Sequence, residues 1–444
     1  MSYTGLSPEQ RSIMLEAAGA TSIDNLFSDI PKEIQTDCIP GLPEPLSEIE
    51  IEKELNLIGF KNSEFRTIFT GGGAYNHYIP PVVDEISARS EFYTSYTPYQ
   101  PEVSQGTLAA IFEFQTMISA LTGLDITNAS MYDGATSMAE AVMMGIRTNG
   151  RRKVLVSRGV HPNYRQVLKT YAWAGDFDIV EIPFENGLTD LKKTRGLIDD
   201  KASSIIIQSP NFLGNIEDIQ SFNNIADNSE IILIIAVVEA MSLGLLKGPG
   251  ELGASIVCGE IQSFGNPLNF GGPYAGYISA EKDFLRRMPG RLVGQTLDSA
   301  GNRAFALTLQ TREQHIRREK ATSNICTNQG LIALRTAVYL SLIGVKLRSL
   351  AQLNHNTASY LKNKLTTAGI KTVHDNTPFF NEFIVKPRDT SRYISEFRKR
   401  GINPGIEIGR WYDEYNGCLL VCATEMISQS DADEYSDIIR EAAL

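Results

Sequence analysis

Short apolar segments alternate with longer amphipathic segments between about residues 150 and 280. The apolar segments are rich in Val and Ile and contain few polar residues, which is typical of strands buried on both faces of a mainly parallel sheet. They span residues 153–157, 178–183, 204–208, 231–238, 255–258 and 275–279. Because ligands of such sheets bind on the loops beyond the carboxyl ends of the strands, we expect the functional site there.

Helical patterns stand on both sides of this region. Ser7 and Pro8 mark the start of a first helix, residues 47–60 resemble a second, and long helical stretches run from about 325 to 368. Two strands and two helices are predicted after them, at 382–386, 418–423, 391–400 and 429–443. The chain is therefore predicted to have three parts: an N-terminal helical segment (1–60), a large α/β domain (61–330) and a small C-terminal α+β domain (331–444).

A further helix is predicted from Ser104 to about Leu121. Ser104 is placed to cap its first turn, and Gly123 is placed to end it. The side chains expected on its apolar face are Leu108, Ile111, Phe112, Ile118 and Leu121.

A loop of small residues, Asp133 to Ser137, precedes a helix predicted over roughly 138–148. Ser137 and Glu140 have the spacing of a capping box. A loop of this kind at a helix N-terminus presents free N–H groups to an anion, so Gly134, Ala135, Thr136 and Ser137 are candidates for a phosphate site. The alternative is an ordinary, well-capped helix.

Glu239 directly follows the longest apolar run, Ile231 to Val238. Glutamate is rarely buried without a partner. One interpretation is an acid that pairs with a ligand nitrogen or a cation, and the other is a strand-end residue that faces solvent.

Two loops have unusual compositions. The Gly- and Pro-rich loop from Gln262 to Pro273 indicates close backbone approach, and it lies within residues 248–281, which contain no Lys or Arg. The loop from Glu91 to Gly106 has a tyrosine at every third position, at 93, 96 and 99, between prolines. Tyrosines on a stiff loop favour an interface or a pocket wall, although a loop packed on its own domain is the alternative.

Charge and cysteine content exclude some classes of protein. The net charge of −11 argues against nucleic-acid binding, although Arg312 to Lys320 form a local basic patch that either receives an anion or is simply solvated. Five scattered cysteines indicate reduced thiols and a cytoplasmic protein, and we interpret Cys418 and Cys422 as core residues. We expect no secretory signal, no membrane span and no metal site, because no motif for any of them is present.

Five segments together resemble one family. They are FTGGGAYNHYIPP (69–81), SEFYTSYTPYQPEVSQGTLAAIFEFQT (90–116), MYDGATSMAEA (131–141), GEIQSFGNPLNFGGPYAGY (259–277) and TREQHIRREKATSNICTNQ (311–329). These segments resemble the glycine-cleavage P-protein family, glycine dehydrogenase (decarboxylating), and within it subunit 1 of the split, two-subunit form. The resemblance extends over nearly all residues from about 5 to 444.

The resemblance implies a fold, a reaction and partners. The expected fold is that of the type I, aspartate-aminotransferase-like, pyridoxal-phosphate-dependent transferases. The expected partner, subunit 2, holds pyridoxal phosphate on a lysine. Together the two subunits are expected to decarboxylate glycine and pass the aminomethyl group to the lipoyl arm of the H-protein, with this chain completing the active site at the interface. Matching the Gly-Gly-Pro loops of the two subunits sets Gln262 opposite that lysine and Glu239 opposite the acid of the cofactor nitrogen. Because glutamine has no nucleophilic amine, this chain is expected to hold no cofactor covalently.

Site residues are carried over from the family motif by motif. The resemblance implies that one set faces the partner's pocket as substrate-side groups: Asn76, His77, Tyr93, Tyr96, Thr97, Tyr99, Glu102 and Gln105. It implies a second set that reaches the partner's cofactor phosphate: Thr322, Ser323 and Asn324. Gly134 to Ser137, with Glu239, would be the relic of a cofactor pocket.

Two other functions stay open on the sequence alone. The chain could be a binding or regulatory pseudoenzyme that pairs with subunit 2 without shaping its chemistry. It could also be an independent pyridoxal-phosphate enzyme that uses another lysine, such as Lys247.

Overall fold

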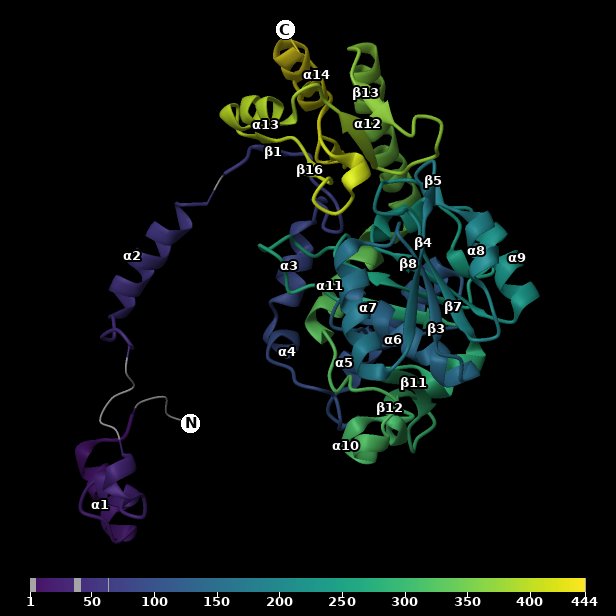
Figure 1. The fold of residues 1–444 in the computed structure, drawn as a ribbon. Helices are drawn as coiled ribbons and strands as arrows, with labels where there is room; N and C mark the ends of the chain where they lie inside the picture. Colours follow the sequence, from purple (N-terminus) through teal and green to yellow (C-terminus); the bar gives the residue numbers. More distant parts are fainter. Residues whose placement is uncertain (1–4, 36–40, 63, 444) are drawn as a thin grey trace. The chain divides into compact units, whose positions relative to one another are not determined.

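The computed structural model describes residues 5–35, 41–62 and 64–443 (Figure 1), so that Cys38 lies outside the described residues. The chain falls into two compact units, Met1–Glu64 and Phe65–Leu444. The second unit contains both the large sheet and the C-terminal lobe.

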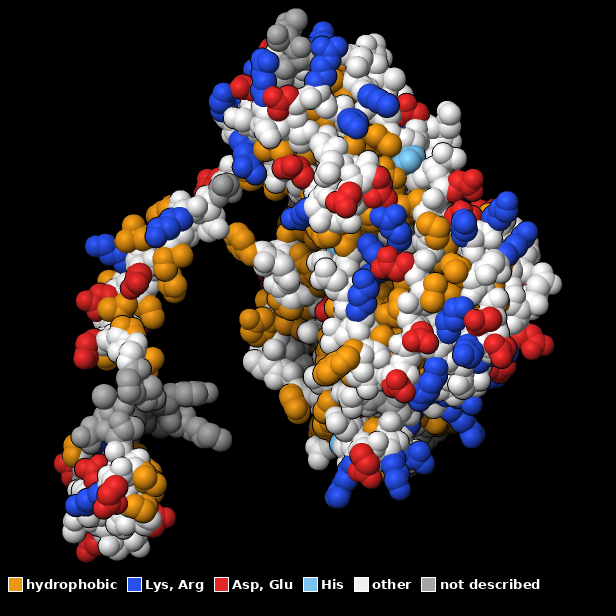
Figure 2. Space-filling view, viewed as in Figure 1, with side chains coloured by type: hydrophobic (Ala, Val, Ile, Leu, Met, Phe, Trp, Pro, Cys, Tyr) orange, Lys and Arg blue, Asp and Glu red, His pale blue; other side chains and the backbone are white. Residues whose placement is uncertain are grey.

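The first unit is helical, as predicted. Its helices are α1 (Pro8–Ala17), η1 (Asp24–Phe27), η2 (Lys32–Ile34) and α2 (Glu48–Gly59). Ser7 and Gln10 form a capping box at the start of α1, and Ser47 and Glu50 form one at the start of α2. None of the residues in α1 and α2 is buried, and Figure 2 shows apolar side chains exposed along this unit.

The large sheet confirms all six predicted strands. Its strands, in order across the sheet, are β2 (Ile126–Thr127), β10 (Gly276–Ala280), β9 (Ile256–Glu260), β8 (Ile232–Val237), β7 (Ala202–Gln208), β3 (Lys153–Ser157) and β4 (Asp178–Ile182). The five strands from β9 to β4 are parallel to one another, and β10 is antiparallel to both of its neighbours.

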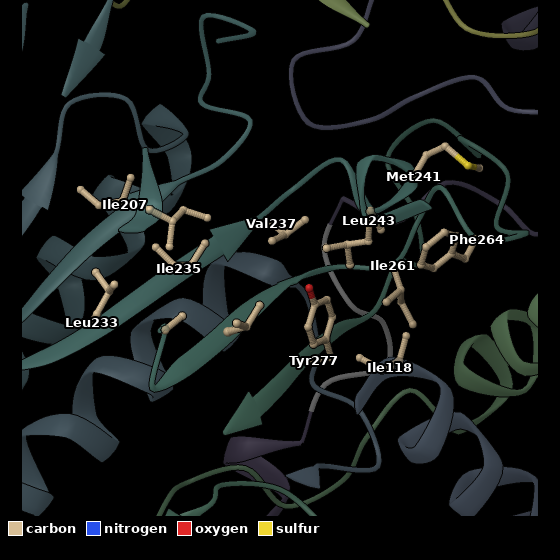
Figure 3. Packing of buried hydrophobic residues seen from close by; sticks show 14 of the residues in the cluster. Ile118, Ile207, Leu233, Ile235, Val237, Met241, Leu243, Ile261, Phe264 and Tyr277 are labelled. Carbon is tan, nitrogen blue, oxygen red and sulfur yellow. The ribbon is translucent and has the colours of Figure 1, made fainter. Parts of the chain in front are cut away.

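Strand β8 shows why apolar and polar residues do not alternate in these segments. Leu233, Ile235 and Val237 pack into one core cluster, which Figure 3 shows beside Tyr277 and Ile118. The residues between them pack into a second cluster on the opposite face. Helices α5 (Gln105–Thr122), α9 (Ile219–Ser229) and α11 (Gly330–Ile343) cover the first face, and α6 (Gly134–Asn149) and α7 (Pro162–Gly175) cover the second. Both faces of the sheet are therefore apolar.

The C-terminal lobe is a four-stranded sheet covered by helices. Its strands, in order, are β13 (Lys371–Val373), β14 (Glu382–Lys386), β17 (Leu419–Cys422) and β16 (Ile406–Glu407). Its helices are α12 (Leu347–Thr367), α13 (Thr390–Lys399) and α14 (Gln429–Ala443). A strand from early in the chain, β1 (Thr67–Ile68), pairs with β15 (Ile402–Asn403) of this lobe. Residues 67–69, which we assigned to the large domain, therefore belong to the lobe.

Shorter elements connect these parts. They are α3 (Pro81–Ser87), α4 (Ser90–Tyr93), α8 (Leu191–Leu197), α10 (Gln314–Arg317), the hairpin β5 (Phe184–Glu185) with β6 (Leu188–Thr189), and the hairpin β11 (Leu292–Leu297) with β12 (Arg303–Thr308). One helical stretch among the described residues, Gly330–Thr367, is long and apolar enough to cross a membrane by length and composition. Its buried side chains include Ile332, Tyr339 and Leu347, which pack into the core cluster of the large sheet.

Two predicted caps are wrong in detail. Ser104 stands at the N-cap of α5, but its side chain caps no N–H group; Gly123 ends the helix in the left-handed conformation, as predicted. Ser137 and Glu140 form no capping box, because α6 begins at Gly134. The cap is Asp133, whose Oδ1 accepts from the Thr136 N–H at 2.7 Å.

Candidate functional site

The expected site at the carboxyl ends of β8 and β9 is filled by a loop of the same chain. Glu239 follows β8 and Gln262 follows β9, and each side chain is buried. The loop from Gly71 to Tyr78 lies against both of them and buries Tyr75 and His77. This filled pocket, formed by the loop and the side chains that bind it, is the centre of the site.

Gln262 holds the backbone of this loop with its whole amide. Its Oε1 accepts from the Tyr75 N–H at 2.8 Å. Its Nε2 donates to the carbonyl of Tyr75 at 3.0 Å and to that of Asn266 at 2.7 Å. A side chain with every polar atom satisfied in this way is a structural clamp.

Glu239 pairs with an imidazole of its own chain. His77 lies between two carboxylates: its Nε2 is 3.2 Å from Glu239 Oε2, and its Nδ1 is 2.9 Å from Glu425 Oε2. Burial alone lowers the pKa of His77, but Glu239 and Glu425 together raise it to about 10. Burial likewise opposes ionisation of Glu425, but His77 brings the pKa of that carboxyl below its usual value. The buried group is therefore an imidazolium between two carboxylates, and the solvent-facing alternative for Glu239 is wrong.

A third buried carboxylate, Glu382 of β14, binds the start of the loop. Its Oε1 accepts from the Gly72 N–H at 2.7 Å, and its Oε2 accepts from the Tyr75 hydroxyl at 2.8 Å. Burial raises the pKa of Glu382 to about 7. His161 Nδ1 accepts from a backbone N–H, so its Nε2 carries the proton and donates to the Gly72 carbonyl at 2.8 Å. Burial lowers the pKa of His161 to about 4, which keeps this ring neutral.

The N-terminus of α6, the candidate phosphate site, already binds carboxylates of the chain. Glu260, at the end of β9, accepts from the Gly134 N–H at 3.0 Å, and Asp133 accepts from the Thr136 N–H. Ser137 is buried and donates its hydroxyl to the carbonyl of Asp133 at 2.6 Å. A Cβ on Gly134 would lie 2.0 Å from the Tyr164 hydroxyl, so the space beside this turn is occupied as well.

These residues do not fit pyridoxal phosphate. The position expected to hold a lysine holds the clamped Gln262, the expected nitrogen-pairing acid is engaged by His77, and the phosphate position is engaged by Glu260. Lys247 is exposed, whereas the pocket residues Glu239 and Gln262 are buried. No step of a cofactor reaction is therefore assigned to the pocket of this chain.

The loop from Glu91 to Gly106, called the tyrosine loop below, contains the most exposed side chains of the predicted site. Tyr96 is 83% exposed and Tyr93 is 65% exposed, and both line a cavity of about 160 Å³ together with Thr97 and Asn328. Glu102 is exposed too. The structure thus brings three of the predicted substrate-side residues, Tyr93, Tyr96 and Thr97, to one cavity, and Glu102 follows them in the same loop.

Four other predicted substrate-side residues have partners inside the chain. His77 is buried in the filled pocket, so our expectation that it faces the partner is wrong. The Gln105 amide binds both backbone groups of Phe305 in β12, so it fastens the hairpin instead of facing a substrate. Tyr99 is partly exposed, and its hydroxyl accepts from the buried Arg291 at 2.8 Å. Asn76 is half-buried, and its carbonyl accepts from Thr424 at 2.6 Å.

Thr322, Ser323 and Asn324 line a separate cavity of about 410 Å³. Its wall also contains Glu140 and Arg147, whose closest charged atoms are 3.8 Å apart. The predicted phosphate contacts thus have a guanidinium beside them. Of the basic patch, Arg312 is buried and donates to the carbonyl of Met288, whereas residues 315–320 are exposed.

Sequence reasoning missed the carboxylates that complete the filled pocket. Glu260 and Glu382 stand at the ends of apolar strands, and Glu425 follows β17 closely. Glu260 and Glu425 carry the signal that singled out Glu239, a carboxylate at or after the end of an apolar strand, whereas Glu382 begins its strand. Arg291 carries no such signal, because nothing near it in the sequence indicates that Tyr99 will lie beside it.

Comparison with known proteins places this geometry in a family. The model of the glycine cleavage system P-protein matches residues 1–439. The chain belongs to the glycine cleavage system P-protein family. Within this P-protein family it is 46% identical over 442 residues to the probable glycine dehydrogenase (decarboxylating) subunit 1 of Carboxydothermus hydrogenoformans, covering 99% of each chain. It is 46% identical over 438 residues to the protein of the same description from Moorella thermoacetica, covering 98% of each.

Solved structures agree with the P-protein assignment. A glycine decarboxylase (P-protein) of the glycine cleavage system, in inhibitor-bound form, aligns over 100% of both chains with a TM-score of 0.92 and 42% identity. An aspartate aminotransferase from Thermus thermophilus aligns over 85% of this chain and 99% of its own with a TM-score of 0.60 and 13% identity, which shows the fold alone. The expected pyridoxal-phosphate-dependent transferase fold is confirmed.

Proposed function

We propose that this chain is subunit 1 of a two-subunit glycine dehydrogenase (decarboxylating) and completes an active site whose pyridoxal phosphate is held by subunit 2. One observation carries the proposal. The chain has the P-protein fold, yet its own residues fill the pocket in which that fold would hold a cofactor. The chemistry of the pair must therefore occur in a pocket of the other subunit.

The exposed tyrosine loop is this chain's contribution to that pocket. Tyr93, Tyr96 and Thr97 line one cavity, and Glu102 is exposed further along the same loop. Tyrosine supplies a rigid, amphipathic contact surface, and a carboxylate beside it can bind the amino group of a small substrate. Arg291 holds the loop in place by donating a hydrogen bond to the Tyr99 hydroxyl.

The pair acts on glycine and on the lipoyl arm of the H-protein. In the assembled enzyme the cofactor supplies the electron sink for decarboxylation. Thr322, Ser323 and Asn324 are proposed to approach the cofactor phosphate across the interface, because their cavity contains Arg147. We further propose a cytoplasmic location; the four described cysteines, Cys258, Cys326, Cys418 and Cys422, form no disulfide, and Cys418 and Cys422 are buried in the core.

The test uses the co-expressed pair of subunits. We expect glycine-dependent release of carbon dioxide with H-protein only when both chains are present. We expect Tyr96→Phe and Glu102→Gln to lower kcat of the pair by about 10- to 100-fold without loss of assembly, since groups that contact the transition state carry effects of this size. Tyr360→Phe on α12 and Glu185→Gln on β5 are the matched controls, and both should leave kcat unchanged.

Assembly with unchanged kcat in both loop variants would instead identify a pseudoenzyme that only binds subunit 2. Glycine-dependent activity of this chain alone would overturn the proposal altogether. A chain that does not co-purify with subunit 2 would have the same consequence.

A further inference from the structure

We propose that the filled pocket is a positioning element, in which Gln262, Glu382 and Glu425 fix the loop from Gly71 to Tyr78 and thereby the segment that carries the tyrosine loop. The inference rests on the proposed function, because it assigns these buried residues a purpose in the partner's site. They touch no substrate and act through the loop that they hold.

The backbone of the loop is bound by side chains at six points. Three N–H groups have buried acceptors: Gly72 donates to Glu382, Tyr75 to Gln262, and Tyr78 to Glu425 at 2.8 Å. Three carbonyls, those of Gly72, Tyr75 and Asn76, accept from His161, Gln262 and Thr424. Backbone groups of a buried loop must be paired, and here side chains from distant parts of the chain pair them. The path of the loop is therefore set by tertiary structure.

Glu425 joins the two lobes at this loop. It follows β17 of the C-terminal lobe and binds both the His77 ring and the Tyr78 N–H. Its Oε2 also accepts from Asn354 of α12 at 2.8 Å, while Glu239 on the far side of His77 belongs to the large sheet. The ionic group of His77, Glu239 and Glu425 thus holds the lobes and the loop in one arrangement.

A charged cluster of this kind is a poor way to gain stability alone. Apolar residues of similar volume often stabilise a core as well as a buried ion pair does, whereas charged and hydrogen-bonded groups demand one geometry. The ionic group of His77, Glu239 and Glu425, together with the buried carboxyl group of Glu382, accordingly points to a requirement for a defined loop position. A loop that only filled space would not need them.

The position of the loop from Gly71 to Tyr78 determines that of the tyrosine loop, because the chain connects them through α3 and α4. After Tyr78 the chain continues through Ile79 to Pro80 and Pro81, where α3 begins. Arg335 of α11 binds Asp84 of α3 at 2.7 Å, and the same guanidinium donates to the carbonyl of Gly265 at 3.1 Å. The turn from Gln262 to Gly265 therefore holds both the loop and α3, and α3 is followed by α4 and the tyrosines.

The test replaces Gln262 by a residue that fills the same volume but forms no hydrogen bonds to the loop. Gln262→Met keeps the length of the side chain and removes all three hydrogen bonds, and Gln352→Met, at an exposed site on α12, is the matched control. Thr424→Val is a milder second variant that removes the bond to the Asn76 carbonyl and a longer one, at 3.3 Å, from the Met426 N–H. Each is purified with subunit 2 and measured for assembly, for the cofactor absorbance of the pair, for hydrogen exchange of the amides at 72–78, and for kcat and KM for glycine.

We expect faster exchange at 72–78 and a kcat that falls about 10- to 100-fold, because displacement of a positioning segment by about 1 Å has effects of this size. Assembly and cofactor absorbance should stay intact, and Gln352→Met should resemble the wild type. Unchanged kcat together with faster exchange would overturn the positioning role. If Gln262→Met does not assemble, Thr424→Val decides by the same criteria. An unchanged kcat in Tyr96→Phe, by contrast, would count against the proposed function itself.

Discussion

The strongest prediction concerns the imidazolium of His77. His77→Gln removes the positive charge between Glu239 and Glu425 but keeps a polar side chain of similar reach. In the variant both carboxylates remain buried, and the cation that compensated their charge is absent. The folded state of the second unit should therefore lose stability near neutral pH.

The magnitude follows from the pKa of the ring. A rise from 6.5 to about 10 is roughly 3.5 pKa units, and at about 1.4 kcal/mol per unit it corresponds to roughly 5 kcal/mol. Removal of one partner of a buried ion pair typically costs about 3–5 kcal/mol, which agrees. Because the pKa in the folded state is raised, this stabilisation is fully present below pH 6.5 and is lost as the pH rises through about 10.

The assay is urea unfolding of wild type and variant at pH 6.5, 8 and 10, followed by circular dichroism. The difference between the two should be about 3–5 kcal/mol at pH 6.5 and should shrink towards pH 10, where the wild-type ring loses its own proton. Asn363→Gln on an exposed turn of α12 is the control and should behave as the wild type. A difference below about 1 kcal/mol, or one that does not change with pH, would refute the reasoning.

Three further predictions follow from the same contacts. Burial raises the pKa of Glu382 from 4.5 to about 7, so the wild type should lose up to about 3 kcal/mol of stability as the pH rises between these values. Glu382→Gln should lack this loss in thermal melts. Parallel curves of melting temperature against pH for the two proteins would contradict the prediction. Gly259→Ala would place a Cβ 1.9 Å from the Val237 carbonyl and should cost about 3 kcal/mol or more in urea unfolding, whereas Gly294→Ala, with 3.5 Å to its nearest neighbour, should cost under about 1; equal effects would refute the close approach. Gln262→Lys should yield no cofactor adduct after borohydride reduction of the isolated chain, because the loop still fills the pocket, and a stoichiometric adduct would show that the pocket opens.

Local patterns along the chain were enough to predict the strands and most of the helices. A strand buried on both faces needs apolar residues at consecutive positions, and a helix start needs a cap within three residues, so both leave local signals such as Ile231 to Val238 and Ser7 with Gln10. The motifs also determined the family, because long segments matched in order. The exposed tyrosines at 93 and 96 were found for the same reason, since a stiff aromatic loop is a local feature.

The contents of the relic pocket, in contrast, depend on contacts between distant parts of the chain. Glu239 was identified from its place after a buried strand, but its partner His77 lies 162 positions away in the chain, and Glu425, the second carboxylate on His77, lies 186 positions from Glu239. A buried carboxylate must find a compensating group, and the sequence shows that need without showing which group meets it. The same holds for Gln105 and Tyr99, whose partners in β12 and at Arg291 are brought to them by folding. Local patterns fix elements, whereas the pairing of buried polar groups depends on which elements meet.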